Sequence, residues 1–381
     1  MVSGALFLAL QVIAAGLVIS LMQYMSSRTS QLNPIKKTDV VSDKRSFNLR
    51  VRQNFTTEHV TSHLLQTRVS KQATSNPFHI VQSNDSIARV SQKRPIHVSD
   101  PFKSIICHTF SPGRTGNHLF EYASILGIAE TTGKSFFFTN SDELQRLLKM
   151  PPVQKNSSWL HGRCRQAEQV REDHGCQYDR RLISLEPGKD YDIGQYLQSW
   201  LYFDAIRDEV REAMTFNDDI VAAATRVVQT LKLRFPNTTL VGVHVRRGDL
   251  AVDGSKSRAQ GYLTAPPEFF QRATRYFRQR FSRVAFVVLG EDRQWSTEHI
   301  PSVDNDVVVL EPNSPAVDMQ ILSMTDHMIR TVGTFGWWAA FKMAGRPTVV
   351  SLKEFVKNNS WISRWYTSNA ADFMLPGWLA M

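Results

Sequence analysis

The sequence LVGVHVRRGD at residues 240–249 is a run of buried-type residues that ends abruptly in charge, as expected of a core strand of an α/β sheet. Side chains alternate along a strand, so His244 and Arg246 share one face while the valines pack behind them. Arg246 and Arg247 then leave the carboxyl end of the strand, where open α/β sheets bind ligands. A guanidinium group matches phosphate oxygens in planarity and charge. The stretch indicates an anion site or, with about equal weight, an arginine pair at the strand end that is solvated at the surface or bonded to Asp249.

Short apolar runs alternate with amphipathic stretches from residue 104 onward, a pattern typical of an α/β protein with a largely parallel sheet. Two such halves meeting near 235–239 predict a cleft between domains. The stretch 151–192 is expected to be irregular and polar. The predicted strands are 105–110, 136–139, 240–245, 284–289, 307–310, 328–332 and 348–352. The predicted helices are 117–131, 218–233, 267–281, 316–324 and 337–344.

A second motif, RTVGTFGWWAAF at residues 330–341, is predicted to form a strand, a glycine turn and a helix. Glycine lets backbone N–H groups approach an anion, and the amino end of the helix adds partial positive charge. Gly333, Thr334 and Phe335 would then form a phosphate cradle without a Walker lysine. A glycine turn of this kind is also a common tight connection, so the motif alone does not decide the function.

Two further segments carry polar residues at the ends of predicted helices. Asp318 opens an apolar helix after Ser-Pro, as an ordinary first-turn acid or as a carboxylate that accepts from a nucleotide base; the residues alone do not separate the two. The segment SPGRTGNHLFEYA at residues 111–123 joins the first strand to the first helix through a glycine-bearing turn. This turn predicts a ligand loop with Arg114, Asn117 and His118 at its rim.

The charge distribution argues against a nucleic-acid binder. The chain of 381 residues has a net charge of +10, and residues 26–103 alone hold 13 Lys or Arg against 5 Asp or Glu. The remainder is nearly balanced, and no basic stripe is interleaved with aromatic residues. Residues 26–103 are rich in Ser, Thr, Gln and Asn, so we expect an extended, mobile stem.

The amino-terminal residues 2–24 are uncharged and apolar apart from isolated Gln and Ser. At about 1.5 Å per residue the segment is long enough to cross a bilayer, so we expect a spanning helix rather than a cleaved signal peptide. Positive charges follow the span, which taken literally predicts a cytoplasmic carboxyl-terminal side. Glycosylation sequons favour a lumenal one, because they act only in the lumen. The sequons begin at Asn54, Asn84, Asn156, Asn237 and Asn358.

The cysteines and one acidic triplet bear on metals and redox state. Cys107, Cys164 and Cys176 lack the spacing of a zinc site, and they predict either a disulfide between Cys164 and Cys176 or three free buried thiols. Asp304-Asn305-Asp306 matches the DxD pattern of metal-dependent glycosyltransferases. Asn and Asp also favour turns, and we expect a turn here rather than a metal site.

Taken together, these motifs resemble the galactoside alpha-1,2-fucosyltransferases, glycosyltransferase family 11. The matching segments follow one another in order through the predicted globular part, and they are specific as a set. The usual family pattern has Gln where His118 stands, which puts only that contact in doubt. The matches are 113–117 with 122–123, 244–249, 286–288 with Trp295, 314–318 and 331–340.

The resemblance implies a GT-B-like architecture, with two Rossmann-type domains facing a cleft. It also implies inverting, metal-independent transfer from GDP-fucose, and a Golgi membrane protein of type II with a lumenal catalytic domain. The expected parts of the chain are an anchor at 1–25, a stem at 26–103, an acceptor-side domain at 104–236 and a GDP-fucose-binding domain at 237–381.

The resemblance also assigns roles to individual residues. Arg246 and Thr334 would hold the β-phosphate, while His244 and Asp318 would contact guanine. Arg247, Gly333 and Phe335 belong to the expected donor site, and Arg114, Asn117 and His118 to the acceptor or cleft loop. We expect no cofactor and no metal.

The expected reaction transfers L-fucose to the 2-hydroxyl of a galactose-type residue on a glycan. Asp249 and Asp253 lie near the arginines, but the sequence does not assign the base that such a transfer usually needs. Two alternatives stay open. One is a fucosyltransferase with another acceptor or linkage, and the other is an inactive lumenal protein that binds nucleotide sugars or glycans.

Overall fold

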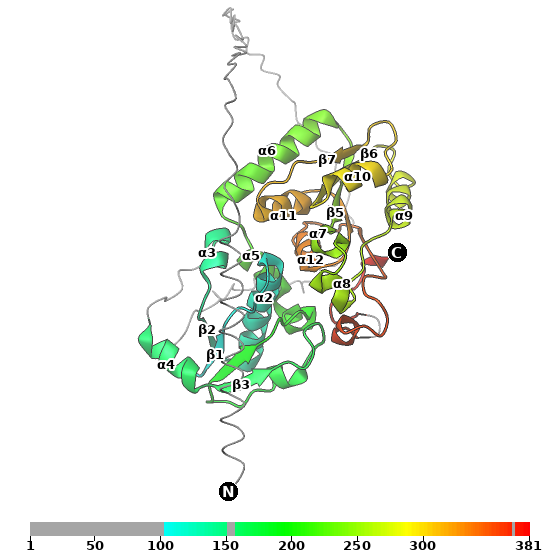
Figure 1. Cartoon of the computed structure of the whole chain (residues 1–381). Helices are drawn as coiled ribbons and strands as arrows, with labels where there is room; N and C mark the ends of the chain where they lie inside the picture. The colour runs from blue at the N-terminus through cyan, green and yellow to red at the C-terminus, as the bar shows by residue number, and fades with distance from the viewer. Residues whose placement is uncertain (1–102, 151–156, 368–369) are drawn as a thin grey trace, which may run out of the picture. The chain divides into compact units, whose positions relative to one another are not determined.

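The computed structural model of the chain describes residues 103–150, 157–367 and 370–381 (Figure 1). The predicted membrane anchor, the predicted stem and the sequons at Asn54, Asn84 and Asn156 lie outside these residues. Within the described ranges, no helix is both long enough and apolar enough to span a bilayer.

The first sheet has four parallel strands in the order β2-β1-β4-β3. Cys107 in the buried strand β1 pairs with Phe137 of β2 and with Asp192 of β4. The strands are β1 (Ile105–His108), β2 (Ser135–Phe138), β3 (Glu168–Arg171) and β4 (Tyr191–Gly194).

Strands β3 and β4 correct the expectation that 151–192 is irregular. The edge strand β3 reads Glu-Gln-Val-Arg and is almost fully exposed, so it has none of the apolar alternation that predicts a strand. Parallel pairing with β4, whose Tyr191 and Ile193 are buried, places it in the sheet. The signal was missing from the sequence because the backbone ladder, and not side-chain burial, holds this edge.

The second sheet has six parallel strands in the order β10-β9-β8-β5-β6-β7, and all seven predicted strands of the chain are confirmed. Strand β5 lies inside the sheet and is buried along nearly its whole length, as expected of a parallel strand covered on both faces. The predicted division into two domains at 236 stays a prediction. The strands are β5 (Thr239–Val245), β6 (Val284–Gly290), β7 (Val307–Val309), β8 (His327–Arg330), β9 (Val349–Ser351) and β10 (Leu379–Ala380).

The five predicted helices are confirmed as α2, α6, α9, α11 and α12, with ends that differ by at most three residues. Helix α2 ends at Gly133, whose φ of 67° suits the left-handed cap that glycine favours. The helices are α2 (Thr115–Thr132), α3 (Asp142–Leu147), α4 (Ser158–Gln166), α5 (Arg207–Ala213), α6 (Asp218–Arg234), α7 (Gly248–Ala251), α8 (Lys256–Gln260), α9 (Pro267–Arg278), α10 (Arg293–His299), α11 (Pro315–Ser323) and α12 (Thr334–Phe341). The short 3-10 helices are η1 (Arg180–Ile183), η2 (Trp200–Tyr202), η3 (Asp204–Ile206) and η4 (Ile362–Trp365).

A single aromatic cluster packs α2 against α12. Phe120 of α2 lies 4.4 Å from the ring centre of Trp337 and 5.1 Å from that of Trp338, and all three side chains are fully buried. Buried aromatic side chains contribute heavily to the stability of a core. This packing fixes the two helices side by side, and it determines where their amino ends lie.

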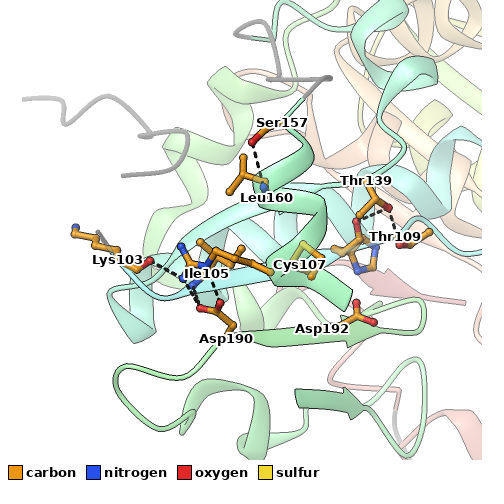
Figure 2. Close-up of a disulfide and its surroundings, with 12 residues drawn as sticks. Lys103, Ile105, Cys107, Thr109, Thr139, Ser157, Leu160, Asp190 and Asp192 are labelled. Atoms are coloured by element: carbon orange, nitrogen blue, oxygen red, sulfur yellow. Dashed lines mark hydrogen bonds and ion pairs between the residues drawn. A yellow bond between two sulfur atoms is a disulfide. The ribbon is translucent and has the colours of Figure 1, made fainter. Parts of the chain in front are cut away.

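The disulfide of the chain joins Cys107 of β1 to Cys164 of α4 (Figure 2). Both sequence-based expectations were therefore wrong, the pairing of Cys164 with Cys176 and the three free thiols. Cys164 and Cys176 are neighbours in sequence, but α4 packs on β1 and carries Cys164 to the strand. Cys176 is a free buried thiol that donates to Gln198 Oε1 at 3.4 Å.

Candidate active site

A cavity of about 620 Å³ lies where the carboxyl ends of β5 and β6 meet the amino ends of α2, α11 and α12. Its size is within the range of small-molecule binding sites. Most of the predicted site residues line it, although they come from distant parts of the chain. They are Arg114, Asn117, His244, Arg246, Asp318, Gly333, Thr334 and Phe335.

The amino end of α12 opens directly onto Arg246. Gly333 precedes the helix with φ of 102°, a conformation that favours glycine. A Cβ atom on Gly333 would lie 2.7 Å from Nη1 of Arg246, so only glycine lets the guanidinium lie against this turn. The partial positive charge of the helix end and the arginine charge therefore act on the same space.

The amino end of α2, the helix that follows β1 of the first sheet, also lies at the cavity. A Cβ atom on Gly116 would lie 2.6 Å from Oγ1 of Thr334, so the absent side chain permits the close approach of the two helices. Thr334 Oγ1 donates to Asn117 Oδ1 at 2.8 Å, and Gln198 Nε2 donates to the same oxygen at 3.2 Å. Two helix amino ends thus converge on the cavity, an arrangement suited to an anion.

Arg246 is fixed by its backbone and lightly held by its side chain. Its N–H donates to Thr331 Oγ1 at 2.9 Å, whereas its guanidinium reaches both oxygens of Asp249 only at 3.4 Å. Burial alone would raise the pKa of Asp249, but a hydrogen bond from Ser257 and the charge of Arg246 outweigh it and lower that pKa. An ionised Asp249 therefore orients Arg246 while leaving donors available.

His244 is neutral and closely packed. Its side chain stacks on Phe335 with ring centres 5.2 Å apart, and only 5% of the residue is exposed. Burial first, and then the charges of Arg330 and Arg246, lower the pKa of His244 to about 3. Its buried Nδ1 has no hydrogen-bond partner in the described structure. A neutral imidazole at the cavity wall can donate or accept one hydrogen bond without adding charge.

Asp318 lies in the first turn of α11 and faces the cavity. Its Oδ1 accepts from the backbone N of Asn313 at 3.1 Å and from Asn313 Nδ2 at 3.0 Å. Burial raises the pKa of Asp318, and the two bonds from Asn313 partly offset that rise. Both bonds end on one oxygen, so the carboxylate retains capacity to accept from a ligand.

Three of the predicted site residues, Arg247, Arg114 and His118, are placed differently from the others. Arg247 does not line the cavity, because its Nε donates to Asp292 at 3.1 Å and its guanidinium stacks 4.1 Å from the ring centre of Trp295. Arg114 lines the cavity but pairs with Glu291 at 2.9 Å. His118 lines a neighbouring cavity instead.

The structure also shows where the acidic residues lie that the sequence suggested as a base or as metal ligands. Asp249 lines the cavity, whereas Asp253 is exposed and bonded to Arg258. Asp306 of the DxD triplet accepts from Arg278 at 2.7 and 3.0 Å, and Asp304 adopts a turn conformation with φ of 50°. Across residues 103–150, 157–367 and 370–381, no group of three or more His, Cys, Asp or Glu is arranged to hold a metal ion.

The cavity is also lined by Glu143 and Glu291, which were not among the site residues predicted from the sequence. Both follow the carboxyl end of a strand, Glu143 after β2 and Glu291 directly after β6. A burst of polar residues after an apolar strand was the signal that singled out Arg246, and the segment 139–143 carries the same signal.

Comparison with known proteins gives the class of the chain. The profile of glycosyl transferase family 11 matches residues 73–381, so the chain belongs to glycosyl transferase family 11. It is an enzyme of the fucosyltransferase class. Galactoside alpha-(1,2)-fucosyltransferase 1 of Oryctolagus cuniculus is 30% identical over 288 residues, 71% of each chain.

Other similar proteins have names of the same kind. Galactoside alpha-(1,2)-fucosyltransferase 1 of Bos taurus is 28% identical over 295 residues, covering 71% of this chain and 74% of that one. Galactoside alpha-(1,2)-fucosyltransferase 2 of Pongo pygmaeus is 28% identical over 271 residues, covering 70% and 76%. The solved fucosyltransferase NodZ from Bradyrhizobium is 12% identical, with a TM-score of 0.40 over 62% of this chain and 92% of that one.

Proposed function

We propose that the chain transfers L-fucose from GDP-fucose to the 2-hydroxyl of a galactose-type residue on a glycan. The observation that carries this proposal is the convergence of Arg246 with the amino ends of α2 and α12 on one cavity. A diphosphate needs such a concentration of positive charge and N–H donors. The names of the relatives support fucose as the transferred sugar and galactose as the acceptor.

The donor would lie with its β-phosphate at Arg246 and Thr334 and its guanine at His244 and Asp318. Guanine presents N–H donors that a carboxylate accepts, which suits the remaining capacity of Asp318. The neutral His244 adds a hydrogen bond without repelling the arginine. Gly333 permits the close approach, and Phe335 packs on His244.

The proposed reaction inverts the anomeric carbon and needs no metal. As the C1–O bond of fucose breaks, negative charge grows on the β-phosphate, and the guanidinium of Arg246 with the two helix ends stabilises that charge. The acceptor oxygen attacks from the opposite face. Loss of activity in EDTA with recovery in Mn²⁺ would contradict metal independence, whereas unchanged activity in EDTA would support it.

We also propose a type II Golgi membrane protein with a lumenal catalytic domain, anchored by residues 2–24. The disulfide between Cys107 and Cys164 is typical of an oxidising compartment. The sequon residues Asn237 and Asn358 are both exposed, so a glycan could attach to either. An endoglycosidase shift that becomes smaller in the Asn237→Gln, Asn358→Gln double variant would support glycosylation at these positions, and an unchanged shift would contradict it.

The test of function uses the full-length chain with GDP-fucose and a glycan panel, with product linkage and anomeric configuration read by NMR. Arg246→Lys keeps the charge but loses the planar fork, so we expect turnover to fall at least ~100-fold while the protein still folds. The matched control is Arg272→Lys on the exposed face of α9. Wild-type turnover by the Arg246→Lys variant would contradict the phosphate role.

A further inference from the structure

A second cavity, of about 420 Å³, lies beyond the carboxyl ends of β1 and β2. It is bounded by residues 110–113, by Asn140, by residues 142–144 and by His118. It shares Gly113 and Glu143 with the donor cavity, so the two spaces adjoin at these residues. A molecule in the second cavity could therefore present one of its groups to a ligand in the first.

The chemistry of the second cavity suits a sugar. One wall is the ring of Phe110, which is fixed by stacking on Phe138 at 5.1 Å and 12°. Another carries polar groups of Asn140 and Asp142, and the amide of Asn140 is fixed because its Oδ1 accepts from the backbone N of Phe110 at 2.8 Å. An apolar wall with a few oriented polar groups is the usual form of a small-ligand site.

Glu143 stands at the junction and is held on both oxygens. Thr115 Oγ1 donates to Oε1 at 2.8 Å, and Oε2 lies 2.8 Å from Nδ1 of His118. The other side of the His118 ring is also held, because Nε2 lies 3.1 Å from the carbonyl oxygen of Ser111. Each carboxylate oxygen can accept twice, so Glu143 is oriented and still able to accept a proton.

The other acids that line the donor cavity have partners of their own and differ from Glu143 in position. Asp249 orients Arg246, Glu291 pairs with Arg114, and Asp318 accepts from Asn313. None of the three borders the second cavity. Among the acids that line the donor cavity, Glu143 is thus the one that also faces the space beside it.

We propose that the second cavity binds the acceptor sugar and that Glu143 is the base that takes the proton of its attacking hydroxyl. This inference rests on the proposed fucosyl transfer. The acceptor oxygen forms a bond to C1 of fucose, its proton passes to the Glu143 carboxylate, and the C1–O bond to the β-phosphate breaks with its electron pair on GDP. His118 and Thr115 act as positioning residues for the base.

The experiment measures transfer by the full-length chain and, separately, GDP affinity by calorimetry. In Glu143→Gln the shape and the bond from Thr115 are retained but the base is lost, so kcat should fall ~100-fold to ~10,000-fold with GDP affinity within about twofold. The control Glu209→Gln, on the exposed surface of α5, should behave as wild type. Asp142→Asn tests the subsite and should raise the KM of the acceptor but not that of GDP-fucose.

The outcomes separate the inference from the proposed function. Transfer by Glu143→Gln within about fivefold of wild type overturns the base, and an unchanged acceptor KM in Asp142→Asn overturns the subsite. In both cases wild-type transfer to galactosides leaves the proposed function intact. A wild-type protein that binds GDP but fucosylates nothing on the panel overturns both.

Discussion

The hydroxyl of Thr334 donates to Oδ1 of Asn117 at 2.8 Å, and this one bond joins residues 217 positions apart in the sequence. It ties the amino end of α12 to the amino end of α2, and so it ties the two sheets together at the cavity. The glycine at position 116 makes the approach possible.

We predict measurable coupling between Asn117 and Thr334. In a double-mutant cycle of Asn117→Ala and Thr334→Val, the coupling in free energy of unfolding should be about 1 kcal/mol, the usual contribution of a hydrogen bond. Each single variant should also weaken GDP binding, because the helix ends lose their alignment. Denaturant unfolding and calorimetry measure the two effects. Thr230→Val, on the exposed surface of α6, is the control, and additive effects would contradict the link.

Gly336 should be essential for the position of His244. A Cβ atom at 336 would lie 2.5 Å from Nδ1 of His244, so Gly336→Ala must displace the ring from the cavity wall. We expect GDP affinity to fall by about tenfold or more, through loss of a positioned donor-site residue. Gly162→Ala in α4 is the matched helical control, because Nη2 of Arg165 would lie 3.9 Å from the new Cβ atom, at an ordinary contact distance. Equal GDP affinity in the two variants would contradict the prediction.

Thiol titration should distinguish the observed disulfide from the alternatives. Unreduced, denatured protein should show a single reactive thiol, Cys176, because Cys107 and Cys164 are joined. Peptide mapping of the labelled protein identifies that thiol. Three thiols, or a single thiol at Cys107, would contradict the structure. Replacing Cys164 with Ser should lower the free energy of unfolding by ~2 to 4 kcal/mol, the usual range for a disulfide that closes a loop of this length. Thermal unfolding of both proteins provides the comparison.

Stability should depend on pH through the buried Glu172. Burial raises the pKa of Glu172 from 4.5 to about 8, although the backbone N of Leu197 donates to it at 2.7 Å. The folded state then binds the proton more tightly than the unfolded chain. This tighter binding of the proton stabilises the folded state. The stabilisation is fully present below about pH 4.5 and is lost as the pH rises to about 8.

Glu172→Gln removes that titration. The free energy of unfolding of wild type, relative to the Gln variant, should fall between pH 4.5 and pH 8 by on the order of a few kcal/mol. Urea unfolding at several pH values measures this difference, with the exposed Glu209→Gln as control. A constant difference across the pH range would contradict the assignment.

The strands that carry the donor cavity could be predicted because they are buried on both faces. Strands β5 and β6 are rich in valine and largely apolar, and apolar runs of this kind predict buried strands of a parallel sheet from a single sequence. The exposed strand β3 gave no such signal, since its place depends on backbone pairing. The disulfide was missed for a related reason: the partner of Cys164 is chosen by the packing of α4 on β1, which sequence spacing does not reveal.

From the sequence alone we could identify residues that line the cavity of the proposed donor site: His244 and Arg246 at the charged end of β5, the glycine turn before α12, and Asp318 at the start of α11. These are local features, and local patterns of apolar and charged residues can be recognised in the sequence alone. Only the tertiary structure decided that Arg247 turns to Asp292, that Asn117 binds Thr334, and that Glu143 stands between two cavities. Such contacts join residues far apart in sequence, and the packing of α2 against α12 is what brings them together.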